Sequence, residues 1–462
     1  MHPMSISTAP PPVHAPRTLV LLQAPILSTL LRLAGPNVLV MLAQASTGLV
    51  EAHFVGRLGT DALAGMALVF PGVMLMQMMS SGAMGGGIAS AIARTLGAGR
   101  QAEADALVLH ALAINAVLGL AFTLAGLLLG PALYRVMGGS GGSLTAALQY
   151  SNVVFGGAVL MWTMNALASV VRGTGNMLVP AVVITGGALV LVPLSPCLIF
   201  GWGPFPALGV AGGGWALLAY YVGGGSVLLA YLGGGRAVVR LRLVRLRAAA
   251  LWSILRVGLL ASLVSVQTNL VVTATTAYVG GFGVGAIAGY GAGSRLEYLL
   301  VPLVFGLGSP LVALVGTNLG AGQRGRAVRV AWVGGAAAFV MTEAIGLAAA
   351  LWPEAWLRLF GADPAMLAAG AAYLRAAGPF YGFFGLGMAL YFASQGAGRL
   401  LWPLVAAVLR MGIAVGGGWL ALHLAGSLGM VFLSLGAGLV VMGAVNAAAL
   451  AAGAWFKGDR LA

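Results

Sequence analysis

Long apolar runs recur along the whole chain, and the short segments between them contain most of its charged residues. Each run is roughly 20 residues long, which is the length that an α-helix needs to cross a hydrocarbon core of about 30 Å. The runs lack the strict alternation over about 10 residues that is typical of membrane β-barrel strands. Because backbone polar groups in lipid must be satisfied within the spanning structure, the pattern predicts an all-α integral membrane protein.

Twelve runs are long enough to be transmembrane helices. We expect them near residues 34–55, 62–92, 106–130, 148–171, 178–200, 208–232, 254–279, 286–316, 328–351, 369–393, 402–424 and 428–455. Roughly the first 18 residues are proline-rich, lack the apolar core of a cleavable signal peptide and are expected to be disordered. The predicted domains are a tail leading to the first helix (1–33), a six-helix bundle (34–235), a basic linker (236–253) and a second six-helix bundle (254–462).

The second half of the chain repeats the first. Four landmarks recur at an offset of 223 or 224 residues: FVGRLGTDALAG (54–65) with YVGGFGVGAIAG (278–289), LGAG (96–99 and 319–322), Tyr150 with Tyr373, and GTGNMLVP (173–180) with GAGRLLWP (396–403). Six helices per half is an even number, so both halves have the same orientation, related by a pseudo-two-fold axis along the membrane normal. Parallel repeats of this kind are typical of secondary transporters, whose substrate site lies between the halves near the midplane.

Composition and charge support this interpretation. The chain is 60% hydrophobic and only 7% charged, whereas soluble domains contain about 25% charged residues. Its net charge of +14 reflects arginines concentrated in alternate loops, so we expect no nucleic-acid partner. The positive-inside rule then places both termini in the cytoplasm. The segment GGGRAVVRLRLVRLRAAALW could bind acidic lipid head groups, although a plain linker is the favoured explanation.

Nine acidic residues are present, and three of them, Glu51, Glu297 and Glu343, fall inside predicted spans. An ionised carboxylate at bilayer depth costs several kcal/mol, so such a group is neutral, paired or faces a water-filled cavity. A proton relay is the default functional hypothesis for such a residue. The surroundings of Glu343 are the most lipid-like of the three, which makes it the weakest candidate.

Glu51 has the strongest case. Asn37 and Gln44 precede it at intervals of seven residues, and this spacing predicts a polar stripe that faces a cavity. Pairing with Arg57 is the alternative, but two residues six positions apart do not share a helix face. Glu297 either lines a cavity in the second half or forms a structural ion pair, and the sequence leaves both possibilities open.

The sequence gives little support for metal binding, phosphate binding or catalysis. Cys197 is the only cysteine and Lys457 the only lysine, and no His/Asp/Glu cluster has metal-ligand spacing. The glycine-rich segments therefore lack the lysine of a phosphate-binding loop, and close helix packing explains them better. We expect no enzyme activity, no catalytic residues, no metal and no cofactor. Methionines and aromatic residues such as Phe70, Tyr220 and Tyr221 could coat a cavity, although ordinary packing is the more general explanation.

The segment GPNVLVMLAQASTGLVEAHFVGRLGTDALAG resembles the first helix and following loop of the multidrug and toxic compound extrusion (MATE) family. ARTLGAG (93–99), RGTGN (172–176), ALGVAGGG (207–214) and GSRLEYLLVPLVFGLG (293–308) are similar to further family landmarks, in family order. The resemblance covers about residues 30–456. It implies two six-helix bundles around a V-shaped cavity, and export of amphipathic, often cationic drugs in exchange for H⁺ or Na⁺. It also implies a multi-pass protein of the bacterial inner membrane, which we expect to be monomeric and surrounded by lipid.

The resemblance also suggests roles for individual residues. Glu51 would be the coupling acid, with Glu297 as a second acid and Pro36 as the point where the first helix bends. The implied cavity residues are Gln44, Asn165, and Gln267 or Asn269 in place of an acid, and Asn37 joins them through the polar stripe. Leu191 and Ser195 stand where the family often has Asn and Asp, and span 10 carries no acid. These departures argue against a sodium site built from acids of the second half and leave Glu51, with Glu297, as the coupling group. We expect exchange for protons, with Na⁺ kept open as the coupling ion. A flippase or exporter of a lipid-linked or other metabolite on the same fold is the alternative.

Overall fold

The computed structural model describes residues 15–456, except for the side chains of Ala45, Ser46, Leu49, Tyr298, Leu299 and Ala425. Every regular element in this part of the chain is helical. Eleven helical stretches are long and apolar enough to cross a membrane, and α6 with α7 forms a twelfth if the pair is one span bent by 46°. The predicted all-α membrane fold is thereby confirmed.

The first half contains a short leading helix and six spans. In chain order these are α1 (Pro16–Gln23), α2 (Ile26–Gly56), α3 (Thr60–Gln77) continued by the π-helix η1 (Met78–Met84) and α4 (Gly85–Gly97), α5 (Gln101–Val136), α6 (Gly141–Gly156) with α7 (Ala158–Gly173), α8 (Leu178–Phe200) and α9 (Val210–Gly233). The fourth span is broken at Gly157, between α6 and α7.

The second half follows the same plan. Its elements are α10 (Ala248–Gly280), α11 (Val284–Ser294), α12 (Glu297–Gly320), α13 (Arg324–Leu351), α14 (Pro353–Leu357), α15 (Pro364–Ala377), η2 (Gly378–Phe380), α16 (Tyr381–Ala397), α17 (Leu401–Met411), η3 (Gly412–Gly416), α18 (Gly417–Leu420), η4 (Ala421–Ala425) and α19 (Leu428–Ala451). Its fourth span is also broken, at η2 between α15 and α16. The two halves therefore share even the interruption of their fourth span, in agreement with the repeat found in the sequence.

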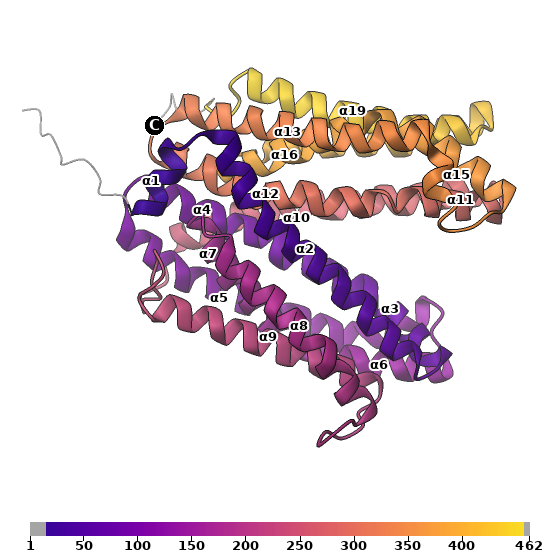
Figure 1. Cartoon of the computed structure of the whole chain (residues 1–462), viewed down its shortest axis with the longest axis horizontal. Coiled ribbons are helices and arrows are strands. Elements are labelled where there is room, and N and C mark those ends of the chain that lie inside the picture. Colours follow the sequence, from indigo (N-terminus) through magenta and orange to yellow (C-terminus); the bar gives the residue numbers. More distant parts are fainter. Residues whose placement is uncertain (1–14, 457–462) are drawn as a thin grey trace, which may run out of the picture.

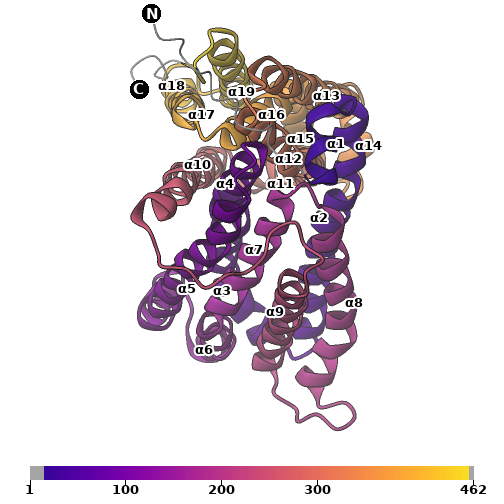
Figure 2. The ribbon, with the colours of Figure 1, turned by 90° about the vertical axis from the view of Figure 1, so that its left-hand side faces the viewer.

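The two halves form two bundles that meet at one end of the molecule and diverge toward the other (Figure 1). They meet at the end where α1 lies, on the left in Figure 1 and facing the viewer in Figure 2. We call this the α1 end. There α4 packs on α12 and α16, while α10 packs on η1, α4 and α5. At the divergent end, α3 packs with α6 and α11 packs with α15, each pair within its own half.

Helices α4 and α12 cross at the α1 end with almost no space between their backbones. A Cβ atom added at Gly97 would clash with the carbonyl oxygen of Thr317, and one added at Gly320 would clash with that of Arg94. Gly97 and Gly320 are 223 residues apart, and so are Arg94 and Thr317. This crossing therefore lies on the pseudo-two-fold axis that relates the halves.

Both first helices begin earlier than their apolar runs suggested. Helix α2 starts at Ile26 rather than near residue 34, α10 starts at Ala248 rather than near 254, and residues 16–23 form α1. The early turns of α2 pack on the second bundle, because Leu30 and Ala34 belong to a buried cluster with Leu311. Protein contacts replace lipid along these turns, so a strictly apolar sequence is not required there.

Candidate functional site

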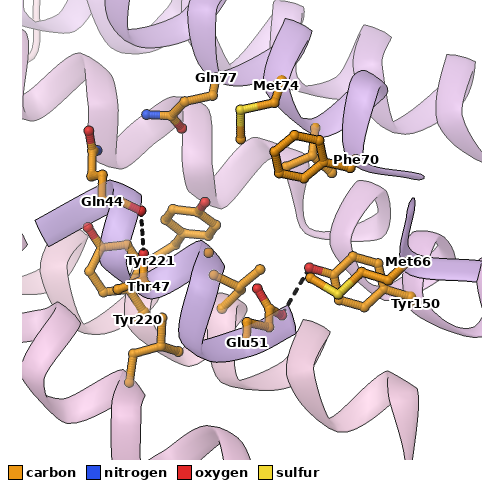
Figure 3. A pocket seen from close by; sticks show the side chains of 14 residues that line it. Gln44, Thr47, Glu51, Met66, Phe70, Met74, Gln77, Tyr150, Tyr220 and Tyr221 are labelled. Carbon is orange, nitrogen blue, oxygen red and sulfur yellow. Dashed lines mark hydrogen bonds between the residues drawn. The ribbon is translucent and has the colours of Figure 1, made fainter. Parts of the chain in front are cut away.

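A cavity of about 120 Å³ lies inside the first bundle, between α2, α3, α6, α8 and α9 (Figure 3). Helix α2 contributes Gln44, Thr47, Gly48 and Glu51; α3 contributes Met66, Phe70, Val73, Met74 and Gln77; Tyr150, Leu191, Leu217, Tyr220 and Tyr221 complete the wall. The sequence spacing of the wall residues explains why α2 and α3 contribute most of them. The α2 residues recur at three- and four-residue intervals, as do those of α3, so each set forms one helix face.

Among the described residues of this wall, Glu51 has the only carboxyl group and no side chain is basic; Glu51 is 6% exposed. The hydroxyl of Tyr150 donates a hydrogen bond to its Oε1 at 2.9 Å (Figure 3). Gly213 makes room on the other side, because a Cβ atom added there would lie 2.8 Å from the same oxygen. None of the ion pairs found in the described part of the chain involves Glu51. The carboxyl group therefore has a phenol, rather than a cation, as its close partner.

The remaining wall combines aromatic rings, thioethers and a few amides. Tyr220 and Tyr221 lie with ring centroids 5.1 Å apart, and Phe70 lies near Met74 on the facing helix (Figure 3). Aromatic faces attract cations, and flexible methionines adapt to varied apolar shapes. Drug-sized ligands occupy pockets of about 300–1,000 Å³. In this arrangement the cavity therefore suits water, an ion or one cationic group rather than a whole drug molecule.

Of the five predicted substrate-cavity residues, Gln44 alone is among the described wall residues. The Asn37 side chain donates to the carbonyl oxygens of Phe305 and Gly306 at 3.0 and 3.3 Å, so it ties α2 to α12. Asn165 donates to the Ser80 hydroxyl at 2.8 Å and joins α7 to η1. Asn37 and Asn165 are both buried.

The two predicted cavity residues of α10 differ in burial. Gln267 is buried, and its side-chain nitrogen has no hydrogen-bond partner among the described residues. Asn269 is exposed and donates to the carbonyl oxygen of Ser265 in its own helix at 3.0 Å. Pro36 lies inside the continuous helix α2, one position before Asn37.

Glu297 occupies a different setting at the start of α12. The hydroxyl of Tyr373 donates to its Oε1 at 2.5 Å, and the hydroxyl of Tyr381 donates to that of Tyr373 at 3.2 Å. Arg410 is buried close enough to interact electrostatically with Glu297. Tyr373 is the repeat counterpart of Tyr150, so the same tyrosine serves a carboxyl group in both halves. The acids themselves come from different helices, α2 in one half and α12 in the other.

Glu343 and the two positions that depart from the family pattern have local environments of their own. The Glu343 carboxylate accepts a hydrogen bond from the backbone N–H of Gly382 at 2.6 Å, which stabilises the start of α16. Leu191 contributes an apolar surface to the cavity. Ser195 is buried, and its hydroxyl has no partner among the described residues.

Tyr150 is the residue that reasoning from the sequence missed. It served there only as a landmark of the repeat, although its recurrence as Tyr373 was the available signal. A tyrosine at the same position in both halves of a diverged duplication indicates a shared structural role. In the structure, each of the two tyrosines donates a hydrogen bond to a carboxyl group.

Comparison with known proteins agrees with this architecture. The MatE family model matches residues 36–197 and 261–420, once in each half. The FAD transporter of Shewanella oneidensis is 28% identical, over 75% of this chain and 77% of its own length. The probable multidrug resistance protein YoeA of Bacillus subtilis is 24% identical, over 81% of this chain and 82% of its own. A solved multidrug resistance MATE family transporter in an outward-facing conformation has the same fold, with a TM-score of 0.85 at 23% identity, covering 96% of this chain and 100% of that one.

Proposed function

Because the chain belongs to the MatE family, whose members are transporters and not enzymes, we propose that it exports amphipathic cationic drugs in exchange for protons. One observation carries the proposal: Glu51 is buried in a cavity whose described wall contains no basic side chain. A carboxyl group in that setting can hold either a proton or a cation, but not both. Exchange follows from this competition.

The proposed mechanism is alternating access, in which the two bundles rock about the end where they meet. Protonated Glu51 is neutral and releases a cationic substrate, whereas ionised Glu51 attracts one. Ion and drug are coupled if each binds one conformation of the protein better than the other. A bend at Pro36 would let α2 move with the change of charge at Glu51, fifteen residues further along the helix.

The side-chain oxygen atoms of the cavity wall favour a proton over Na⁺ as the coupling ion. A hard cation such as Ca²⁺ or Mg²⁺ prefers six or more oxygen ligands, and Na⁺ likewise requires several. The cavity wall presents one carboxylate, Glu51, with the Tyr150 hydroxyl beside it, and its other side-chain oxygens are neutral amide and hydroxyl groups, on Gln44, Thr47, Gln77, Tyr220 and Tyr221. Leu191 supplies no oxygen from its side chain at a position where the family often has one. A proton needs only the carboxyl group itself.

The arginine-rich loops support a bacterial inner-membrane protein with both termini in the cytoplasm. The α1 end would then be the cytoplasmic end, and the described arrangement would face outward. We also propose that one chain is sufficient, because the two bundles of a single chain frame the transport path.

Export of a metabolite is the second candidate, since one relative is an FAD transporter. FAD carries a diphosphate, which proteins bind with arginine or lysine side chains. The described wall of the cavity offers no such residue. The first-bundle cavity therefore favours cations, and an anionic metabolite would need a site elsewhere between the bundles.

The test is transport by purified protein in proteoliposomes, with ethidium or FAD as substrate and a pH or sodium gradient as the driving force. We expect ethidium transport with the pH gradient alone, and its loss in Glu51→Gln. Glu103→Gln is the matched control, because Glu103 is an exposed acid that pairs with Arg100 outside the cavity. Ethidium transport driven only by sodium would contradict proton coupling, and transport of FAD but not ethidium would replace the proposal with the second candidate.

A further inference from the structure

Two segments outside the transport site lead into the first helix of each half. We call residues 16–25 the first lead-in and residues 234–247 the second lead-in; they directly precede α2 and α10. They occupy corresponding places in the repeat, because residues 16–23 and 239–246 are 223 positions apart. Their conformations differ, since the first contains α1 and the second has no regular secondary structure. Both lie at the α1 end, and the second crosses the first bundle on its way from α9 to α10 (Figure 2).

The first lead-in is held by the second half of the chain. The side chain of Asn318, at the end of α12, donates to the carbonyl oxygen of Leu21 at 3.1 Å, and Arg326 of α13 donates to that of Ala24. The Leu21 side chain is buried against the second bundle. It also touches the first bundle at the turn before α8, where a Cβ atom added to Gly175 would lie 2.7 Å from Leu21 Cδ1.

The second lead-in is held by the first half of the chain. Asp105 of α5 is buried, and its two carboxylate oxygens accept from the backbone N–H of Arg240 at 3.0 Å and from Arg242 Nε at 3.2 Å. Gln101 Nε2 donates to the carbonyl oxygen of Val238 at 2.7 Å. One residue before α10, the backbone N–H of Arg247 donates to Nε2 of His110 at 2.9 Å.

These two attachments are reciprocal. Helices α5 and α13 are the third spans of their halves, and Glu103 in α5 corresponds to Arg326 in α13 at the same offset of 223. Each lead-in is therefore bound to the start of the third span of the opposite half. The first helices follow the same pattern, since α2 packs on α12 and α13 while α10 packs on α4 and α5.

We propose that the two lead-ins are paired latches that hold the bundles together at the α1 end. This inference rests on the alternating access proposed above. When the bundles separate at this end, α2 and α10 must leave the half that they now contact. The latch bonds to Leu21, Ala24, Arg240 and Arg247 connect to those helices through short stretches of chain, so they must break. Weakening either latch therefore raises the population of the state that is open at the α1 end.

The experiment measures opening directly and needs no substrate. A reporter cysteine replaces Thr317, which is 1% exposed and whose backbone lies against Gly97 at the crossing, in a Cys197→Ser background. The rate of labelling by N-ethylmaleimide is measured in proteoliposomes. Arg242→Gln weakens the second latch and Arg326→Gln the first. Arg245→Gln and Arg329→Gln are the matched controls, because each removes an exposed arginine three residues away on the same segment.

We expect labelling to accelerate about threefold in each latch variant, as for the loss of one partly exposed charged contact. The double variant should reach about tenfold, because the free-energy effects of distant substitutions add and their factors on the labelling rate therefore multiply. The controls should stay within twofold of the parent. Equal rates in latch and control variants would overturn the proposal. So would equal acceleration at a second reporter, Ala166→Cys in the first-bundle interior, because that result would indicate general loosening. Labelling that responds as expected in a protein without proton-driven drug transport would support the latches and reject the transported substrate or ion.

Discussion

In each half the repeated tyrosine donates a hydrogen bond to a carboxyl group, but the electrostatic surroundings of the two carboxyl groups differ. In the first half, Tyr150 donates to Glu51 beside a cavity whose described wall contains no basic side chain. In the second half, Tyr373 donates to Glu297, and Arg410 lies within electrostatic range. Glu297 is not part of the cavity wall. The hydrogen-bond donor thus recurs at the same repeat position, whereas the acid comes from α2 in one half and from α12 in the other, where Arg410 lies within electrostatic range.

This difference separates a carboxyl group that can change its partner from one that is fixed. A buried charge with a nearby opposite charge is costly to disturb, because removing one member leaves the other uncompensated. A carboxyl group with only a phenol beside it can exchange a proton for a cation without that penalty. We therefore expect the first pair to control transport and the second to control stability.

Replacing the first acid should have the largest effect on transport. In Glu51→Gln the side chain keeps its size but cannot ionise, so we expect proton-driven ethidium transport to fall at least 100-fold. The melting temperature should stay within about 2 °C of the parent, because no opposite charge is left unpaired. Measurement of both quantities on the same preparation separates loss of coupling from loss of fold. Retained transport would contradict the assignment of Glu51.

Replacing the second acid should instead affect stability. Glu297→Gln removes the carboxylate that accepts from Tyr373 and lies within electrostatic range of the buried Arg410, and we expect a loss of about 1–3 kcal/mol in unfolding free energy. Transport per folded molecule should remain above half of the parent value. Thermal unfolding in detergent checks the first expectation, and initial transport rates check the second.

A second substitution tests whether the uncompensated charge is the cause. Arg410→Met in the Glu297→Gln background removes that charge and places a flexible apolar side chain beside Met442, which Arg410 now contacts at 3.8 Å. We expect the double variant to recover more than half of the lost stability. An additive further loss would show that Glu297 and Arg410 are independent.

The two tyrosines offer a smaller and more direct contrast. A hydrogen bond to a charged group contributes about 1.5–3 kcal/mol, so Tyr150→Phe should slow ethidium transport about tenfold. Tyr373→Phe should change transport by less than twofold. Equal effects of the two substitutions on transport would remove the functional distinction between the halves.

The space beside Glu51 gives the smallest expected effect. Gly213→Ala places a methyl group 2.8 Å from Glu51 Oε1, so the carboxyl group must shift slightly, and we expect about a threefold loss of transport. Gly223→Ala in the same helix is the control, because nothing lies within 4 Å of the added atom. Initial rates at a fixed pH gradient are sufficient for this comparison.

The sequence predicted the helical membrane fold and singled out Glu51, whose functional role stays a prediction, for a physical reason. A carboxyl group in an otherwise apolar run is conspicuous, so Glu51 could be identified without structural information. Asn37 could not be placed, because 14 residues correspond to about 21 Å along a helix axis. Over that distance α2 leaves the cavity and reaches the second bundle. The neighbours of Tyr150 depend on how helices pack, and a single sequence does not state this.

The crossing of α4 and α12 has a consequence for how this chain can change over generations. Gly97 fits against the carbonyl group of Thr317, and Gly320 fits against that of Arg94, so each repeat provides the space that the other occupies. After an ancestral duplication, most positions in the two copies become free to diverge. These two glycines are not free in that sense, since a larger residue in one copy cannot be offset by any change in the other. We expect them to be inherited as a pair, long after the surrounding helices have lost their common sequence.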